Sequence, residues 1–165
     1  MTGEVQTERM TAAADGDVVV FLIGMRINRL RAVRSWLPVF KAMPRMLKEL
    51  SKDASSGLLG FRVLVGGLRD ITVVQYWESA EKLFAYASAA DKEHRPAWAA
   101  YNSRVRNSGP DVGIWHETYA VPEGRYETMY VNMPPHGLAA AHGTEPVGRR
   151  GERAAERMSA DRTDG

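Results

Sequence analysis

The chain has 165 residues, of which 44% are hydrophobic and 25% charged, and its formal net charge is +2. These values predict one globular domain with its own core and exclude a disordered chain. The absence of cysteine excludes disulfides and thiolate metal sites and fits a cytoplasmic protein. The basic residues are scattered and no run of about 18 apolar residues occurs, so we predict no nucleic-acid partner and no membrane helix.

Residues 1–16 lack the basic-then-apolar order of a signal peptide, so we predict a flexible leader and a cytoplasmic location. The apolar, β-branched run Val18 to Ile27 then predicts a buried strand. Apolar residues recur at three- and four-residue spacing from about Arg29 to Ser51, which predicts a helix. Pro38 and Pro44 each remove a helix hydrogen bond, so we expect a kink or two helices.

The second half of the core alternates between strands and helices. Leu58 to Val65 and Ile71 to Trp77 read as antiparallel strands joined by a turn at Gly66-Gly67. A helix over Glu78 to Ala90, with Ser79 as a possible cap, and another from about Asp91 to Asn107 are predicted next. Val112 to Val121 predicts a fourth strand, and Arg125 to Met133 an extra extended segment.

This order predicts an α+β protein of the ferredoxin-like βαββαβ type with an extra strand, over residues 17–142. Helices would cover one sheet face and leave the other apolar and open. A second copy is the natural cover, so we expect a homodimer in which two sheets form a dimeric α/β barrel. Residues 143–165 are polar, charged and short of apolar residues, which predicts a disordered tail.

Histidine is the scarce chemical resource, because the chain has no glycine-rich phosphate loop, no G-x-S-x-G elbow and no H-E-x-x-H pair. His136 and His142 are expected to be solvated loop residues. His116 lies mid-strand among apolar same-face neighbours. It is either a buried neutral histidine with a satisfied hydrogen bond, or a polar group that points into an apolar binding pocket.

His94 starts a predicted helical face that continues through Trp98 and Tyr101. An exposed histidine among charged neighbours is one interpretation. An axial haem ligand is the other, because neutral imidazole commonly binds haem iron. Trp98 and Tyr101 could then line the flat ring, although core packing is the commoner use of such side chains.

Several motifs resemble an uncharacterised bacterial family of monooxygenase-like dimeric α/β-barrel proteins, over about Val18 to Leu138. They are GMRIN (Gly24 to Asn28), W-x-P-V-x-x-A-M-P-x-M-L (Trp36 to Leu47), GLLG (Gly57 to Gly60), QYW (Gln75 to Trp77), GIWHETY (Gly113 to Tyr119) and YVNMPPHGL (Tyr130 to Leu138).

The segments Gln75-Tyr76-Trp77, His94-Arg95-Pro96, Trp115-His116-Glu117 and Tyr130-Val131-Asn132 are more distantly similar to haem-containing aldoxime dehydratases. That resemblance implies haem b, with His94 as proximal ligand and His116 as the distal acid/base group. Arg26 is the candidate cationic residue of the pocket. Aldoxime dehydratases are about twice as long and contain two such halves, so this chain would need a dimer to complete the barrel.

Three functions follow from these observations. The first is a haem enzyme acting on a small molecule that contains an N–O bond or is oxidisable. The second is a cofactor-free monooxygenase of the antibiotic-biosynthesis type, with Trp36, Trp77, Trp98, Asn28 and Arg26 available for its pocket. The third is a non-catalytic haem- or ligand-binding protein, because one fold hosts many functions.

Overall fold

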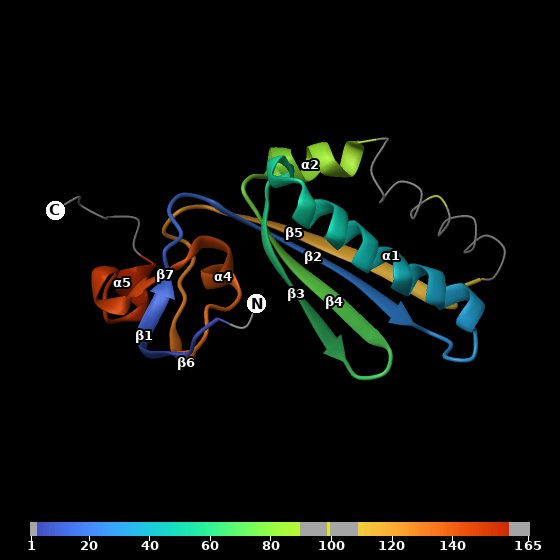
Figure 1. The fold of residues 1–165 in the computed structure, drawn as a ribbon, viewed down its shortest axis with the longest axis horizontal. Coiled ribbons are helices and arrows are strands. Elements are labelled where there is room, and N and C mark those ends of the chain that lie inside the picture. Colours follow the sequence, from blue (N-terminus) through green and yellow to red (C-terminus); the bar gives the residue numbers. More distant parts are fainter. Residues whose placement is uncertain (1–2, 90–98, 100–108, 159–165) are drawn as a thin grey trace.

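A computed structural model of the protein describes residues 3–89, 99 and 109–158 (Figure 1). The elements in chain order are β1 (Gln6–Ala12), β2 (Val18–Ile27), α1 (Val33–Lys52), η1 (Ala54–Ser56), β3 (Leu58–Gly66), β4 (Asp70–Trp77), α2 (Ala80–Ser88), β5 (Val112–Val121), β6 (Tyr130–Met133), α4 (Leu138–His142), β7 (Thr144–Pro146), η2 (Val147–Arg149) and α5 (Ala154–Arg157).

The main sheet has four strands in the order β3-β4-β2-β5, and every neighbouring pair is antiparallel. This is the ferredoxin-like α+β arrangement that the order of elements predicted. The apolar run from Val18 to Ile27 forms a central strand, which explains why apolar residues occur on both of its faces. The predicted turn at Gly66-Gly67 is confirmed, and Gly67 has a φ of +78° there.

Helices α1 and α2 lie on the same side of this sheet (Figure 1). Leu50 of α1 and Leu83 of α2 form one buried cluster with Val19 and Trp77 of the sheet. Helix α1 is a single helix that contains both prolines, so of the two expected outcomes, a kink or two helices, the second is wrong. Ser79 caps α2 as predicted, because its side chain accepts a hydrogen bond from the backbone N–H of Lys82.

Residues 3–16 are not the predicted flexible leader. Strand β1 pairs with both β6 and β7 in a second, three-stranded sheet. Thr11, Ala12 and Ala14 are buried, and Ala12 donates its N–H to Thr128 at 2.8 Å. Backbone pairing with β6 and β7 therefore orders this segment. The extra strand predicted within 125–133 is β6, in this second sheet.

The segment from 143 to 158 is ordered, which corrects the prediction of a disordered tail for these residues. Its charges are not simply solvated: Arg150 forms ion pairs with Glu145 and Asp15, and Arg157 pairs with Glu127 at 2.9 Å. Arg150 also donates to the carbonyl of Ala14 at 2.7 Å. The composition of this segment suggested disorder because composition does not reveal which charged side chains form ion pairs.

Within the described part of the chain, no helix is long and apolar enough to span a lipid bilayer.

Candidate active site

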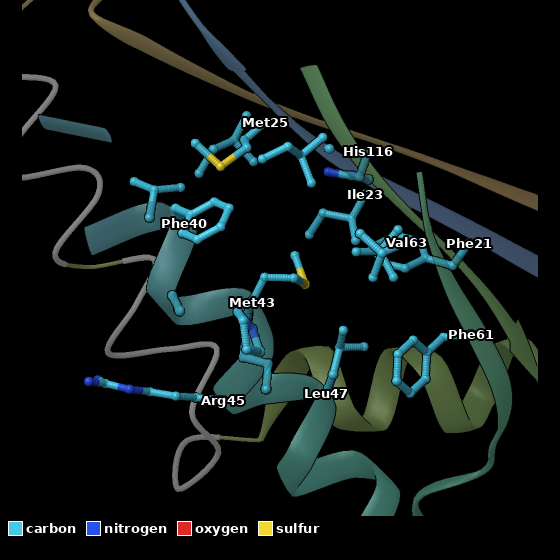
Figure 2. A pocket seen from close by; sticks show the side chains of 18 of the residues that line it. Phe21, Ile23, Met25, Phe40, Met43, Arg45, Leu47, Phe61, Val63 and His116 are labelled. Carbon is cyan, nitrogen blue, oxygen red and sulfur yellow. The ribbon is translucent and has the colours of Figure 1, made fainter. Parts of the chain in front are cut away.

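A cavity of about 960 Å³ lies between the main sheet and helices α1 and α2 (Figure 2). Its walls are overwhelmingly apolar. The sheet contributes Phe21, Ile23, Met25, Phe61, Val63, Ile71, Val73, Ile114, His116 and Thr118, and the helices contribute side chains that include Val39, Phe40, Met43, Leu47, Leu83 and Phe84.

The two walls follow directly from the periodicity of the sequence. Phe21, Ile23 and Met25 alternate along β2 and so share one face. Phe40, Met43 and Leu47 recur at three- and four-residue spacing along α1 and turn toward the sheet in Figure 2. Sequence periodicity therefore identified both surfaces but not the open space between them.

Large apolar side chains of these walls remain accessible. Phe40, Phe61, Val63 and Phe84 are 42–56% exposed although they surround a concave site. Complete burial of such a side chain stabilises a protein by about 1.5–3 kcal/mol. A contiguous exposed apolar surface of this kind is typical of a site that an apolar ligand covers.

His116 is the histidine among the described residues that line this cavity. His116 pairs with Ile23 of β2 in the strand register. The imidazole of His116 lies beside the ring of Phe21, with centroids 5.8 Å apart and planes tilted by 40°. The side chain is exposed, so the interpretation as a buried, hydrogen-bonded histidine is wrong. Within the described ranges no hydrogen bond or ion pair engages its ring, so its nitrogens are accessible to a ligand.

The charged groups that the described part of the chain contributes to the cavity lining are both cations of α1. Arg45 and Lys48 are exposed, and Figure 2 shows Arg45 directed away from the cavity. No carboxylate belongs to this described lining. The site thus combines an apolar interior with one imidazole on the sheet and positive charge at its helical side.

Arg26 is not part of this cavity, which corrects its prediction as a cationic pocket residue. It alternates to the opposite sheet face from Met25, and its Nη1 donates to both carboxylate oxygens of Asp70, at 2.8 and 2.9 Å. The sequence placed it correctly on the first core strand, but its face depends on the register of the strand. Glu117 also lies on that opposite face, where Tyr119 donates a hydrogen bond to it at 2.7 Å.

The other predicted site residues fall into two groups. His94, Trp98 and Tyr101 lie outside the described residues. Three others donate side-chain N–H groups to acceptors within the protein. Trp36 donates to the carbonyl of Leu30, Trp77 to the side chain of Gln75, and Asn28 to the carbonyl of Pro110. None of these three residues is among the described residues that line the cavity.

The cavity could accommodate haem. Its size and apolar walls suit a flat, mostly hydrophobic macrocycle, and His116 supplies an imidazole on one wall. No group of three histidine or carboxylate side chains that could hold a metal ion occurs among the described residues. Haem iron needs only one axial protein ligand, so this finding does not bear on haem.

A family model described as Monooxygenase af470-like matches residues 18–138, which include all four strands of the main sheet and the cavity walls. The chain belongs to the Monooxygenase af470-like family. A fungal relative from Aspergillus fumigatus, named Monooxygenase af470, is 30% identical over 129 residues. That alignment covers 73% of this chain and 44% of the relative, so the chain spans less than half the length of this family member.

Solved structures with low sequence identity are similar to this chain. An aldoxime dehydratase, OxdRE in complex with butyraldoxime, has a TM-score of 0.60 and 16% identity, covering 85% of this chain and 38% of its own. SnoaB, a cofactor-independent oxygenase from Streptomyces nogalater, has a TM-score of 0.44 and 10% identity, covering 62% of this chain and 91% of its own.

Proposed function

We propose that this family member is an enzyme that takes an apolar small molecule into the cavity, with His116 moving a proton at the bound substrate. The carrying observation is the accessible imidazole of His116 within a sheet wall that is apolar apart from Thr118. A few polar groups in a mostly apolar concave site are the usual composition of a binding pocket. Histidine is the side chain best suited to proton transfer near neutral pH.

Monooxygenation is the reaction that family membership supports. In a cofactor-free version, His116 removes a proton from an electron-rich phenol, which makes the substrate a better electron donor to O₂. Oxidation of an activated CH₂ group to a carbonyl by one O₂, with release of one water, balances without an external reductant. The cavity would hold the substrate away from bulk water, while the ring of Phe21 limits where the reacting atom can lie beside His116.

An oxygen-consumption assay tests this proposal. A panel of electron-rich phenols would be supplied to the wild type, to His116→Gln and to Tyr119→Phe, which lies on the opposite face of the same strand. We expect oxygen uptake and product formation to fall at least 100-fold in His116→Gln and to stay unchanged in Tyr119→Phe. Equal turnover by His116→Gln and the wild type would remove His116 from the reaction.

A haem-dependent reaction is the second candidate, favoured by the fit of the cavity to a macrocycle and by the sequence similarity to aldoxime dehydratases. In this version His94 would hold the iron, Trp98 and Tyr101 would line the ring, and His116 would transfer a proton on the distal side. Bound haem b would supply the iron centre at which an N–O-containing substrate is activated.

Absorption spectroscopy during haemin titration separates the two versions. The haem version predicts a Soret band that saturates at one haem per chain, disappears in His94→Ala and persists in His116→Ala. Weak uptake that never saturates and is the same in all three proteins would favour the cofactor-free version. Specific haem binding without turnover of N–O or oxidisable substrates would indicate a haem-binding protein instead.

We also propose that the chain acts in the cytoplasm as a homodimer. Leu64 on the face of the main sheet opposite α1 and α2 is 42% exposed, and this uncovered apolar surface supports the dimer.

A further inference from the structure

Two polar side chains that play no part in the cavity lie on the face of the main sheet opposite α1 and α2. Arg62 of β3 alternates with Phe61 and Val63, which line the cavity, so it points to the other face. Tyr76 of β4 pairs with Gly60, two residues before Arg62, and so shares that face. Arg62 and Tyr76 are therefore diagonal neighbours on adjacent strands.

The segment that follows β5 brings two more polar groups to the same place. Nη1 of Arg62 contacts Nε2 of His136 at 2.7 Å. Because a guanidinium only donates, His136 accepts through Nε2 and carries its ring proton on Nδ1. Tyr130 of β6 accepts the backbone N–H of Ala139 at 3.3 Å, and no acceptor among the described residues takes its own hydroxyl proton. We refer to Arg62, Tyr76, Tyr130 and His136 as the donor cluster.

Gly137 brings the two tyrosine hydroxyls to one spot. A Cβ on Gly137 would lie 3.1 Å from the hydroxyl oxygen of Tyr76 and 3.8 Å from that of Tyr130, so both hydroxyls border the same small space. The backbone of Gly137, with φ +58° and ψ −124°, has a conformation that favours glycine. The run from Tyr130 to Leu138 thus supplies two members of the donor cluster and the glycine that leaves room beside it.

Two donors of the cluster lack an acceptor within the described part of the chain. The Nε–H of Arg62 is buried and has no hydrogen-bond partner. Tyr76 is only 8% exposed, and its hydroxyl forms no hydrogen bond with any described residue. A buried donor without a partner costs free energy, and native proteins satisfy most such groups. Two neighbouring unsatisfied donors therefore indicate a place where an acceptor binds.

The charge of the donor cluster indicates which kind of acceptor fits. No ion pair among the described residues involves Arg62, whereas Arg26 on the same face pairs with Asp70. Burial raises the pKa of the Tyr76 hydroxyl from its ordinary value of 10.0, and the Arg62 charge only partly opposes this, so the hydroxyl keeps its proton. A guanidinium flanked by hydroxyl donors forms charge-assisted hydrogen bonds with carboxylate or phosphate oxygens.

We propose that the donor cluster binds a small oxyanion, a carboxylate or phosphate group, between Arg62 and the hydroxyls of Tyr76 and Tyr130. The guanidinium supplies the charge, and the hydroxyls fix the anion beside Gly137. His136 positions the guanidinium through Nη1 and is itself exposed, so the cluster reaches the protein surface. The site lies on the opposite face of the sheet from the cavity and does not depend on the proposed function.

Isothermal titration calorimetry with sodium phosphate and, separately, with sodium acetate at constant ionic strength tests this proposal. We expect saturable binding to the wild type, and the anion that binds more tightly identifies the group as phosphate or carboxylate. Arg62→Met should abolish binding, and Tyr76→Phe should weaken it at least fivefold. Arg26→Met is the matched control, because Arg26 lies on the same face but is paired with Asp70, and it should bind like the wild type.

Thermal unfolding separates a binding site from a purely structural cluster. Tyr76→Phe removes only a buried hydroxyl without a partner, so without added anion its Tm should equal or exceed that of the wild type. Added anion should raise the Tm of the wild type and leave that of Arg62→Met unchanged. Undiminished binding by Arg62→Met or Tyr76→Phe would overturn the proposal. Weak uptake that never saturates and is the same in all four proteins would also overturn it and indicate an adventitious ion only.

Discussion

Phe21 and His116 project from the neighbouring strands β2 and β5 into one cavity, with their ring centroids 5.8 Å apart. The aromatic ring of Phe21 therefore occupies one side of the imidazole, and the imidazole itself lines the cavity. This arrangement gives an apolar ligand a polar contact at a defined point on the sheet.

Filling the cavity should prevent ligand binding without unfolding the protein. Met43 points from α1 into the space between helix and sheet (Figure 2), so we expect Met43→Trp to occupy volume that a ligand needs. A neutral fluorescent probe such as N-phenyl-1-naphthylamine should bind at least tenfold more weakly. Met129→Trp, at an exposed position outside the cavity lining, is the matched control and should bind like the wild type.

Gly24 is predicted to tolerate no side chain. A Cβ at this position would lie 2.4 Å from the indole of Trp115, so Gly24→Ala must displace the ring or the strand. We expect a loss of about 1–3 kcal/mol in the free energy of unfolding, the usual cost of overpacking. Chemical denaturation would measure this loss in the free energy of unfolding, with Gly113→Ala as the control. Equal stability of the two variants would contradict the close contact between Gly24 and the Trp115 indole.

Arg150 should hold the two ends of the chain together. Its side chain is 12% exposed and contacts Glu145, Asp15 and the carbonyl of Ala14. Arg150→Met leaves Glu145 largely buried without its cation, and removal of one partner of a buried pair costs about 3–5 kcal/mol. We expect the value to fall at the lower end of that range because Asp15 is exposed. Limited proteolysis should then release the C-terminal segment before the main sheet is cleaved.

Stability should fall on acidification because of His142. Burial lowers the pKa of His142 from its ordinary value of 6.5, and the Asp15 carboxylate only partly opposes this shift. The unfolded chain therefore binds the proton at a higher pH than the folded chain. Stability is lost as the pH falls from about 6.5 toward the lowered folded-state pKa. Thermal unfolding at pH 7.5 and 5.5 should show a smaller difference in Tm for His142→Gln than for the wild type.

The sequence was sufficient for the main sheet because each strand carries a local signal. The β-branched run of β2, the glycine turn between β3 and β4, and the Ser79 cap specify their elements without reference to the rest of the chain. In the second sheet, of β1, β6 and β7, only β6 was predicted, as part of the extended segment from Arg125 to Met133. Strand β1 is polar on several positions and becomes ordered only through partners more than 110 residues away, such as Thr128.

The candidate site was likewise predictable from the sequence only in part. His116 could be assigned to an apolar strand face, because alternation fixes the neighbours of a mid-strand residue. Arg26 could not be placed, since a shift of one residue moves a side chain to the other face. The pairing of Arg26 with Asp70 depends on the register of β2 with β4, which alternation within one strand does not reveal.

The most direct measurement of the central claim is an NMR titration that follows the imidazole Cε1–H resonances of the four histidines while N-phenyl-1-naphthylamine is added. The His116 signal would be assigned by its absence in His116→Gln. We expect this signal to shift and to saturate with the same apparent Kd as the probe fluorescence. His136, which contacts Arg62 outside the cavity, should remain unchanged. Saturable probe binding that leaves the His116 resonance unmoved would contradict the assignment of this cavity as the substrate site.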